Sequence, residues 1–254
     1  MFKGFQDTSR SQLFKGFPNL NFQMNNEAYG FSGCTFWLHA AYGLKTQTDL
    51  AAVSSWQDRK RSIDFLQATA GNQPRLVVAD AAFGNKPVIE FQAQQRYLQT
   101  VTGGANINFN GTTVFVFQRL TSSSGANPKR TQLIGTEIAA NAGTSFSMES
   151  NDVANAVGMM GPSTFSFYDT TFFDTNPHIV VISGLNFIEN GAAMTPTGTS
   201  WISFVGSVLS GSVTRSSGTF KLAELLTYED LSLSSTDCIR LSDNVNNSNS
   251  YAIY

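Results

Sequence analysis

Apolar and polar residues alternate along most of the chain after Cys34, in short segments separated by turn residues. Valine and phenylalanine alternate in Thr113–Gln118, and apolar residues alternate with polar ones in Thr144–Glu149. Successive side chains of a strand point to opposite faces, so both segments predict strands with one inward face. The predicted strands are Thr35–His39, Arg75–Val78, Val88–Phe91, Thr113–Leu120, Gln132–Glu137, Thr144–Glu149, Ala156–Met160, Thr164–Tyr168, His178–Leu185, Phe187–Glu189, Thr199–Val205 and Thr219–Tyr228.

Glycine-containing pairs separate these segments and favour tight turns, because glycine and asparagine tolerate positive φ. Asn190-Gly191 follows the alternating residues Leu185–Glu189 and is the strongest hairpin signal. A single short helix is expected around Thr48–Ser54. Many short strands at regular spacing predict an all-β sandwich or barrel.

The first 33 residues have no helical or strand period. Phe2-Lys3-Gly4-Phe5 recurs as Phe14-Lys15-Gly16-Phe17, in a stretch that is too aromatic to stay solvated. Two interpretations have equal weight: the segment packs on its own domain, or it is an extended arm that docks on a neighbouring subunit. The candidate docking residues of the arm are Phe2, Phe5, Phe14, Phe17 and Phe22.

Composition narrows the function classes. The chain has 254 residues, of which 41% are hydrophobic and only 13% charged, with a formal net charge of −2. Helical bundles and coiled coils need more charged faces, and charge-driven disorder needs fewer aromatic residues. The basic clusters Arg59-Lys60-Arg61 and Lys129-Arg130 are too small to indicate nucleic-acid binding. We expect no membrane insertion and no secretory signal peptide, because the start of the chain has no continuous apolar run.

Several motifs occur in an order that resembles a known family. They are Phe36–Ala40, Val53–Asp58, Gln67–Pro74, Asn85–Phe91, Arg96–Leu98 and Lys221–Leu231. Together they resemble the concanavalin A-like, laminin-G-like jelly-roll domains of bacterial surface proteins and phage particles. The resemblance covers about residues 34–242. It implies a jelly-roll sandwich at 34–242, preceded by the arm at 1–33 and followed by a C-terminal tail at 243–254.

The chain departs from this family in two loops. Asp58 is followed by Arg59-Lys60-Arg61 where members usually have a glycine-rich Asp-x-Ser-Gly turn, and Phe91 is followed by Gln92-Ala93 where they often have Phe-Asp-Gly. A metal or sugar site that depends on those loops is therefore not expected. Asp58, Asp64 and Asp80 lack the spacing of a calcium cage, and we expect no metal and no cofactor.

Catalytic patterns are missing from the sequence. It has no paired-carboxylate strand motif, nucleophile elbow, Walker loop, dinucleotide fingerprint or zinc-protease motif. Glu137 and Glu149 are expected on solvent faces, and His39 and His178 are expected to be structural. Cys34 and Cys238 are expected to be buried free thiols, although their pairing is left open. The chain is therefore predicted not to be an enzyme, with a glycoside hydrolase or lyase as the residual case.

Two functions remain. The first is a structural protein of a phage particle, a head decoration, fibre or tail-associated subunit, whose arm docks on other virion subunits. It would form a homo-oligomer and reside in the virion. The alternative is a carbohydrate-binding module that recognises a cell-surface glycan. In that case Tyr97, Tyr168 or Trp201 would stack on sugar rings, although core packing is the commoner role for such aromatic residues.

Overall fold

The structure is a computed structural model. It describes residues 27–92, 96–100, 107–120, 129–135, 145–150, 155–160, 165–168, 174–195, 204–206, 208–209 and 219–254. The arm residues Phe2, Phe5, Phe14, Phe17 and Phe22 lie outside this part of the chain. Most of the described residues are in antiparallel strands, which confirms the all-β class.

The first of two large sheets has the strand order β15-β14-β13-β8-β18-β5-β4, and β1 pairs with the second half of β18. Its strands are β1 (Cys34–His39), β4 (Arg75–Asp80), β5 (Lys86–Phe91), β8 (Thr112–Arg119), β13 (Pro177–Ser183), β14 (Asn186–Glu189), β15 (Ala192–Met194) and β18 (Phe220–Tyr228). β18 is buried along almost its whole length because it lies in the middle of the sheet.

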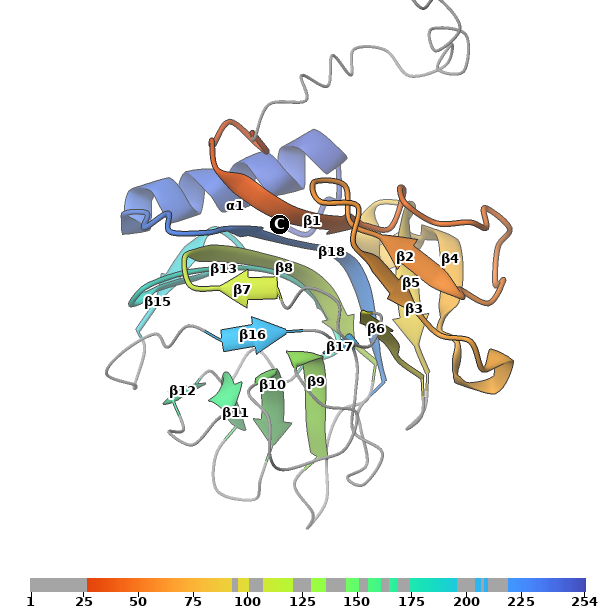
Figure 1. Cartoon of the computed structure of the whole chain (residues 1–254). Helices are drawn as coiled ribbons and strands as arrows, with labels where there is room; N and C mark the ends of the chain where they lie inside the picture. Colours follow the sequence, from red (N-terminus) through yellow and green to blue (C-terminus); the bar gives the residue numbers. More distant parts are fainter. Residues whose placement is uncertain are drawn as a thin grey trace, which may run out of the picture.

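The second sheet has the order β12-β11-β10-β9-β17-β6-β3-β2, and β7 and β16 form a small separate pair. These strands are β2 (Ser55–Gln57), β3 (Asp64–Leu66), β6 (Leu98–Thr100), β7 (Ile107–Phe109), β9 (Lys129–Gly135), β10 (Ser145–Ser150), β11 (Asn155–Met160), β12 (Phe165–Tyr168), β16 (Phe204–Gly206) and β17 (Val208–Leu209). The two sheets face each other as a β-sandwich (Figure 1).

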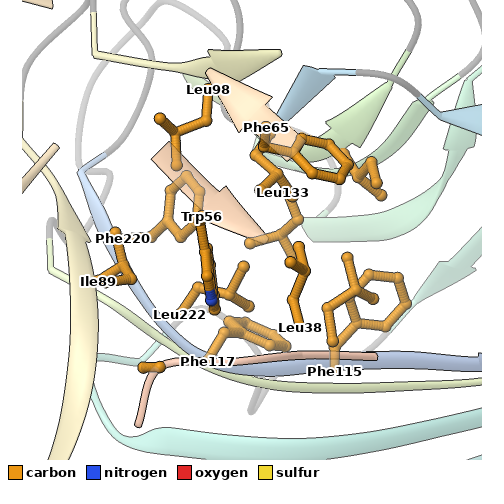
Figure 2. Close-up of a cluster of buried hydrophobic side chains, with 14 of the residues drawn as sticks. Leu38, Trp56, Phe65, Ile89, Leu98, Phe115, Phe117, Leu133, Phe220 and Leu222 are labelled. Carbon is orange, nitrogen blue, oxygen red and sulfur yellow. The ribbon is translucent and has the colours of Figure 1, made fainter. Parts of the chain in front are cut away.

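The inter-sheet core is the cluster of buried side chains between the two sheets. Figure 2 shows Trp56 and Phe65 of the second sheet beside Phe115, Phe117 and Leu222 of the first. Phe91 and Phe220 stack with ring centroids 4.7 Å apart. Alternation along β8 sends Phe115 and Phe117 into this core and Val114 and Val116 to the opposite face. The sequence pattern predicts a single inward face, whereas both faces of β8 are buried, because α1 covers the second one.

A helix, α1 (Ser235–Asn249), covers the opposite face of the first sheet (Figure 1). Between them lies a second cluster, which we call the helix-side core. It includes Val114, Val116, Ile179, Val181, Leu226, Tyr228, Cys238, Leu241, Val245 and Tyr251. The sandwich therefore has a third layer. The predicted boundary between residues 242 and 243 falls inside α1.

The predicted short helix at Thr48–Ser54 is wrong. Its backbone instead bonds to the edge of β4: Leu50 N donates to Leu76 O at 2.7 Å, and Val53 N donates to Pro74 O at 2.8 Å. Leu50 also has a positive φ of 59°, which is incompatible with a right-handed helix. The local apolar run therefore reflects pairing with a strand that is distant in the sequence.

The turn predicted at Asn190-Gly191 is confirmed. Asn190 (φ 48°) and Gly191 (φ 75°) join β14 to β15, and both occupy the left-handed region. Asn85 (φ 61°) leads into β5, in which Val88 and Ile89 face the helix-side and inter-sheet cores respectively. The predicted strand His178–Leu185 is shorter in the structure, because Gly184 (φ 58°) turns the chain after Ser183.

No helix of the described segments is long and apolar enough to span a bilayer. Cys34 and Cys238 are both buried and unpaired, which confirms the expectation of free thiols. Burial raises the pKa of Cys34 to about 12 and that of Cys238 to about 11. Neither thiol is therefore activated as a nucleophile.

Candidate functional site at the root of the N-terminal segment

Residues 27–33, here called the root segment, attach the N-terminal residues to the sandwich. Ala28 and Phe31 exchange two backbone hydrogen bonds of 3.0 Å around a tight turn formed by Tyr29 and Gly30. Tyr29 (φ 53°) and Gly30 (φ 79°) are both left-handed, as a two-residue turn of this kind requires. Ala28 and Phe31 belong to the helix-side core, so the sequence-based arm of residues 1–33 includes residues that pack on the sandwich.

Tyr29 reaches a buried carboxylate, that of Glu224 in β18. Glu224 Oε1 accepts hydrogen bonds from Tyr29 Oη and Trp37 Nε1, each at 2.5 Å. Its Oε2 accepts from Tyr251 Oη at 3.1 Å and from Asn249 Nδ2 at 3.2 Å. With His39, which bonds to Asn249, these residues form the Glu224 cluster.

A β-bulge places Glu224 on the helix side of the sheet. Leu222 pairs with Phe117 of β8, but Glu224 pairs with the adjacent Val116, so Ala223 is the extra residue. Without this bulge, strict alternation from Leu222 would direct Glu224 into the apolar inter-sheet core. The bulge moves a carboxylate from a site with no donors to one with four donors, from Tyr29, Trp37, Asn249 and Tyr251.

The tyrosines of the cluster stay un-ionised at neutral pH. Burial first, and then the charge of Glu224, raise the pKa values of Tyr29 and Tyr251 well above their ordinary range. They therefore act as hydrogen-bond donors. Since the Glu224 carboxylate already accepts four hydrogen bonds, the cluster holds elements together and leaves no carboxylate oxygen for proton transfer with a substrate.

Other contacts fasten the root segment on each side. Tyr228 Oη donates to Ala28 O at 2.6 Å, and Asn244 Nδ2 donates to Tyr29 O at 2.9 Å. Lys60 Nζ donates to Glu27 O at 3.1 Å, and the Arg240 guanidinium lies 4.8 Å from the centre of the Phe31 ring. The donors come from β18, α1 and the loop after β2, so three parts of the molecule hold the root.

The loop after β2 is itself ordered by a buried carboxylate. Asp58 accepts backbone hydrogen bonds from Trp37 at 2.6 Å and from Arg61 at 2.5 Å. This arrangement places the Arg59 guanidinium 4.3 Å from the Trp37 ring centre and 4.0 Å from that of Tyr42. The two tryptophans lie on opposite faces of the first sheet: Trp37 belongs to the helix-side core and Trp56 to the inter-sheet core.

The three aspartates considered as calcium ligands have no shared site. Asp58 accepts backbone N–H groups, and Asp80 pairs with Lys221 at 2.5 Å. Among the residues that the structure describes, no group of three or more His, Cys, Asp or Glu side chains is placed to hold a metal ion.

His39 and His178 are buried and hydrogen-bonded, as the sequence predicted for structural histidines. His178 lies between two carboxylates, with Nε2 3.0 Å from Asp174 Oδ1 and Nδ1 2.6 Å from Glu189 Oε1. Because its nitrogens point in opposite directions, these contacts fix the ring between Asp174, in the segment before β13, and Glu189 of β14.

Of the three candidate sugar-stacking residues, only Tyr97 has a side chain in the described part of the chain. Tyr97 is half-buried at the start of β6, where its N–H donates to Asn72 O at 3.2 Å. Tyr168 ends β12, but its side chain is outside the described portion, as are Trp201 and Glu137.

Sequence reasoning missed Tyr29, Glu224, Asn249 and Tyr251. Glu224 lies in the predicted apolar final strand, and Asn249 and Tyr251 lie in the predicted C-terminal tail. A charged residue inside the predicted strand Thr219–Tyr228 was the available signal, since a carboxylate in a central strand needs partners.

The chain matches no protein-family model and no curated protein sequence. Among solved structures, it is similar to Trypanosoma rangeli sialidase in complex with sialic acid, with 12% identity and a TM-score of 0.48, covering 87% of this chain and 34% of that chain. The Emp47p carbohydrate recognition domain has 10% identity and a TM-score of 0.37, covering 72% of this chain and 96% of that one. The botulinum neurotoxin serotype G binding domain has 10% identity and a TM-score of 0.43, and the match covers 82% of this chain and 50% of that chain. The chain spans about one third of the sialidase chains, and at these identities the likeness concerns the fold alone.

Proposed function

We propose that this chain is a non-enzymatic structural subunit of a phage particle, in which the N-terminal arm docks on neighbouring subunits. The observation that carries the proposal is the attachment of the root segment. Tyr29 bonds to Glu224 in the central strand β18, and Asn244 of α1 bonds to the Tyr29 carbonyl. Tension on residues 1–26 would thus be transmitted to the sheet and the helix, as an assembly arm requires.

The sequence of the arm supports a docking role. Five phenylalanines in residues 1–26 supply apolar side chains, and their Phe-Lys-Gly-Phe repeat offers similar anchors twice. The particle type rests on the resemblance of residues 34–242 to jelly-roll domains of phage particles. Head decoration, fibre and tail-associated subunit are all compatible with this role.

Light scattering of the full chain and of a chain lacking residues 1–26 tests the proposal. Truncation before Glu27 preserves the root segment and hence the Glu224 cluster. We expect a discrete oligomer for the full chain and a folded monomer after truncation. Monomers in both cases would contradict an arm that docks on copies of this chain.

A variant of full length separates apolar docking from mere chain length. Phe2, Phe5, Phe14, Phe17 and Phe22 are all replaced by serine. In a control variant, four polar residues of the same segment, Asn19, Asn21, Asn25 and Asn26, are replaced by serine instead. We expect only the phenylalanine variant to dissociate, and electron microscopy of the control should show the same ordered assembly as the unmodified chain.

A second candidate, carbohydrate binding, is favoured by one observation near Tyr97. Gln67 follows β3, which pairs with β6, and Gln73 Nε2 donates to Gln67 O at 2.8 Å. The Gln67 side chain is buried, and its Nε2 has no hydrogen-bond partner among the described residues. A neutral hydroxyl oxygen would satisfy this donor, and Tyr97 directly precedes β6, the strand that pairs with β3.

A glycan array with the full chain tests this second function. A saturable hit that Tyr97→Ala and Gln67→Ala each weaken would support it. Leu185→Ala, at an exposed turn of the first sheet, is the control that should leave binding unchanged. A hit insensitive to both site variants would place any sugar elsewhere, and the absence of hits would remove the proposal.

A further inference from the structure

His39 is held in one neutral tautomer at the edge of the Glu224 cluster. Its Nδ1 accepts the Ala41 N–H at 3.1 Å, so this nitrogen carries no proton. Its Nε2 lies 3.1 Å from Asn249 Oδ1, which can only accept, so Nε2 carries the proton. The imidazole is almost fully buried. A second proton on Nδ1 would place two hydrogen-bond donors, Nδ1–H and the Ala41 N–H, against each other, and it would put a positive charge in this buried position.

Asn249 links His39 to the root segment and to the end of α1. Its amide nitrogen lies 2.6 Å from Tyr29 Oη, 3.2 Å from Glu224 Oε2 and 3.1 Å from Val245 O. The orientation of this amide depends on the His39 N–H, because that contact occupies Asn249 Oδ1. A change at His39 therefore alters the hydrogen bonds that hold Tyr29.

The root segment is itself under backbone strain. Tyr29 occupies the left-handed region at φ 53°, which a residue with a Cβ adopts only at an energetic cost. Its side-chain hydrogen bonds to Glu224 and Asn249 offset that cost. The turn is therefore inclined to open when those bonds weaken.

The charged and titratable groups around His39 come from every element packed on it. Burial is the largest influence and lowers its pKa below the ordinary 6.5, Glu224 of β18 raises it, and Arg59 of the loop after β2 lowers it. The Tyr42 ring centre lies 5.0 Å from the imidazole, while Tyr29 and Tyr251 remain un-ionised donors to Glu224.

We propose that His39 is an acid-sensitive latch, whose protonation reorients Asn249 and releases the root segment and the end of α1 while the two sheets stay folded. In the closed state the root segment is bound to the sandwich, and in the open state it is released. The closed state binds a proton less readily than the open state. The closed state is therefore most stable above the His39 pKa of the open state, about 6.5, and its stability falls as the pH falls from there towards the lower His39 pKa of the closed state. The release of an assembly arm rests on the proposed function, whereas the latch itself does not.

Hydrogen–deuterium exchange of the full chain between about pH 7.5 and pH 5, corrected for intrinsic rates, tests the latch. We expect exchange of residues 27–36 and 245–254 to accelerate by up to about tenfold per pH unit within the window, while β8 stays protected. Simultaneous loss of protection in all three regions would overturn the proposal, as would no acceleration at the root. Because exchange is measured whether or not the arm assembles subunits, failure of the latch and failure of the proposed function are distinguishable.

The chain has only two histidines, which gives a matched pair of variants. His39→Gln keeps an acceptor for Ala41 and a donor for Asn249 but cannot titrate, so we expect the acid response to disappear. His178→Gln should retain it; the opposite pattern would overturn the proposal.

If His39→Gln does not fold, NMR titration of the unmodified chain decides the question. A His39 pKa below that of a free histidine, with its titration matching the onset of exchange at the root, supports the latch. An ordinary or raised pKa would refute it.

Discussion

At the scale of single residues, Glu224 illustrates how a buried charge is tolerated. Burying a carboxylate costs several kcal/mol unless hydrogen bonds replace its hydration. Four donors meet this need, and they come from the root segment, β1, α1 and the segment after α1. One side chain thus couples segments that are far apart in the sequence.

Glu224→Gln should destabilise the protein strongly. The new amide presents N–H groups to neighbours that are themselves donors, so we expect a loss of about 2–4 kcal/mol in the free energy of unfolding. Glu229→Gln is the control, because the half-exposed pair of Glu229 with Arg61 should contribute about 0–1 kcal/mol. Urea unfolding measures both, and equal losses would contradict the role of Glu224 as a hub.

At the scale of elements, α1 shows how helix signals in a polar segment can be overlooked. Ser234 Oγ accepts from Asp237 N at 3.1 Å, and its hydroxyl donates to Asp237 Oδ2 at 2.8 Å, a reciprocal N-terminal cap. Cys238, Leu241 and Val245 lie on one buried face. Ser250, at φ 53°, ends the helix in a left-handed conformation.

Ser234→Ala should remove the cap and lower the free energy of unfolding by about 1 kcal/mol. Ser235→Ala is the matched control, since Ser235 is the first helical residue and alanine favours helices. Thermal unfolding followed by circular dichroism compares the two variants. A larger loss for Ser235→Ala would show that the cap has little effect on stability.

At the scale of the whole molecule, both ends of the described chain meet on one face of the first sheet. The root segment and the last residues flank α1, and Cys34 and Cys238 lie beneath them in the helix-side core. Opening of this layer exposes the thiols, whereas opening of the inter-sheet core alone does not.

Thiol labelling at about pH 8 should therefore report on this layer. Both cysteines should be unreactive in the folded protein, because burial raises the pKa values of Cys34 and Cys238 to about 12 and 11. The reactivity of each cysteine would rise only as the pH approaches its raised pKa, where the thiolate forms. Single Cys→Ala variants assign the two labelling rates, and rapid labelling of Cys34 in folded protein at pH 8 would contradict its burial.

The sequence by itself determined the local features of this protein. Alternation in Thr113–Gln118 predicted the strand β8, and Asn190-Gly191 predicted the turn between β14 and β15, because strand period and turn geometry depend on neighbouring residues. The same reasoning failed at Thr48–Ser54, whose hydrogen-bond partners lie on β4.

Only the tertiary structure decided the site. Which face Glu224 occupies depends on one bulge against β8, and its donors come from residues near both ends of the described chain. Likewise, Trp37 and Trp56 look alike in sequence but fall in different cores. Local patterns carry no information on which distant groups satisfy a buried charge, because that pairing is set by the packing of the first sheet against α1.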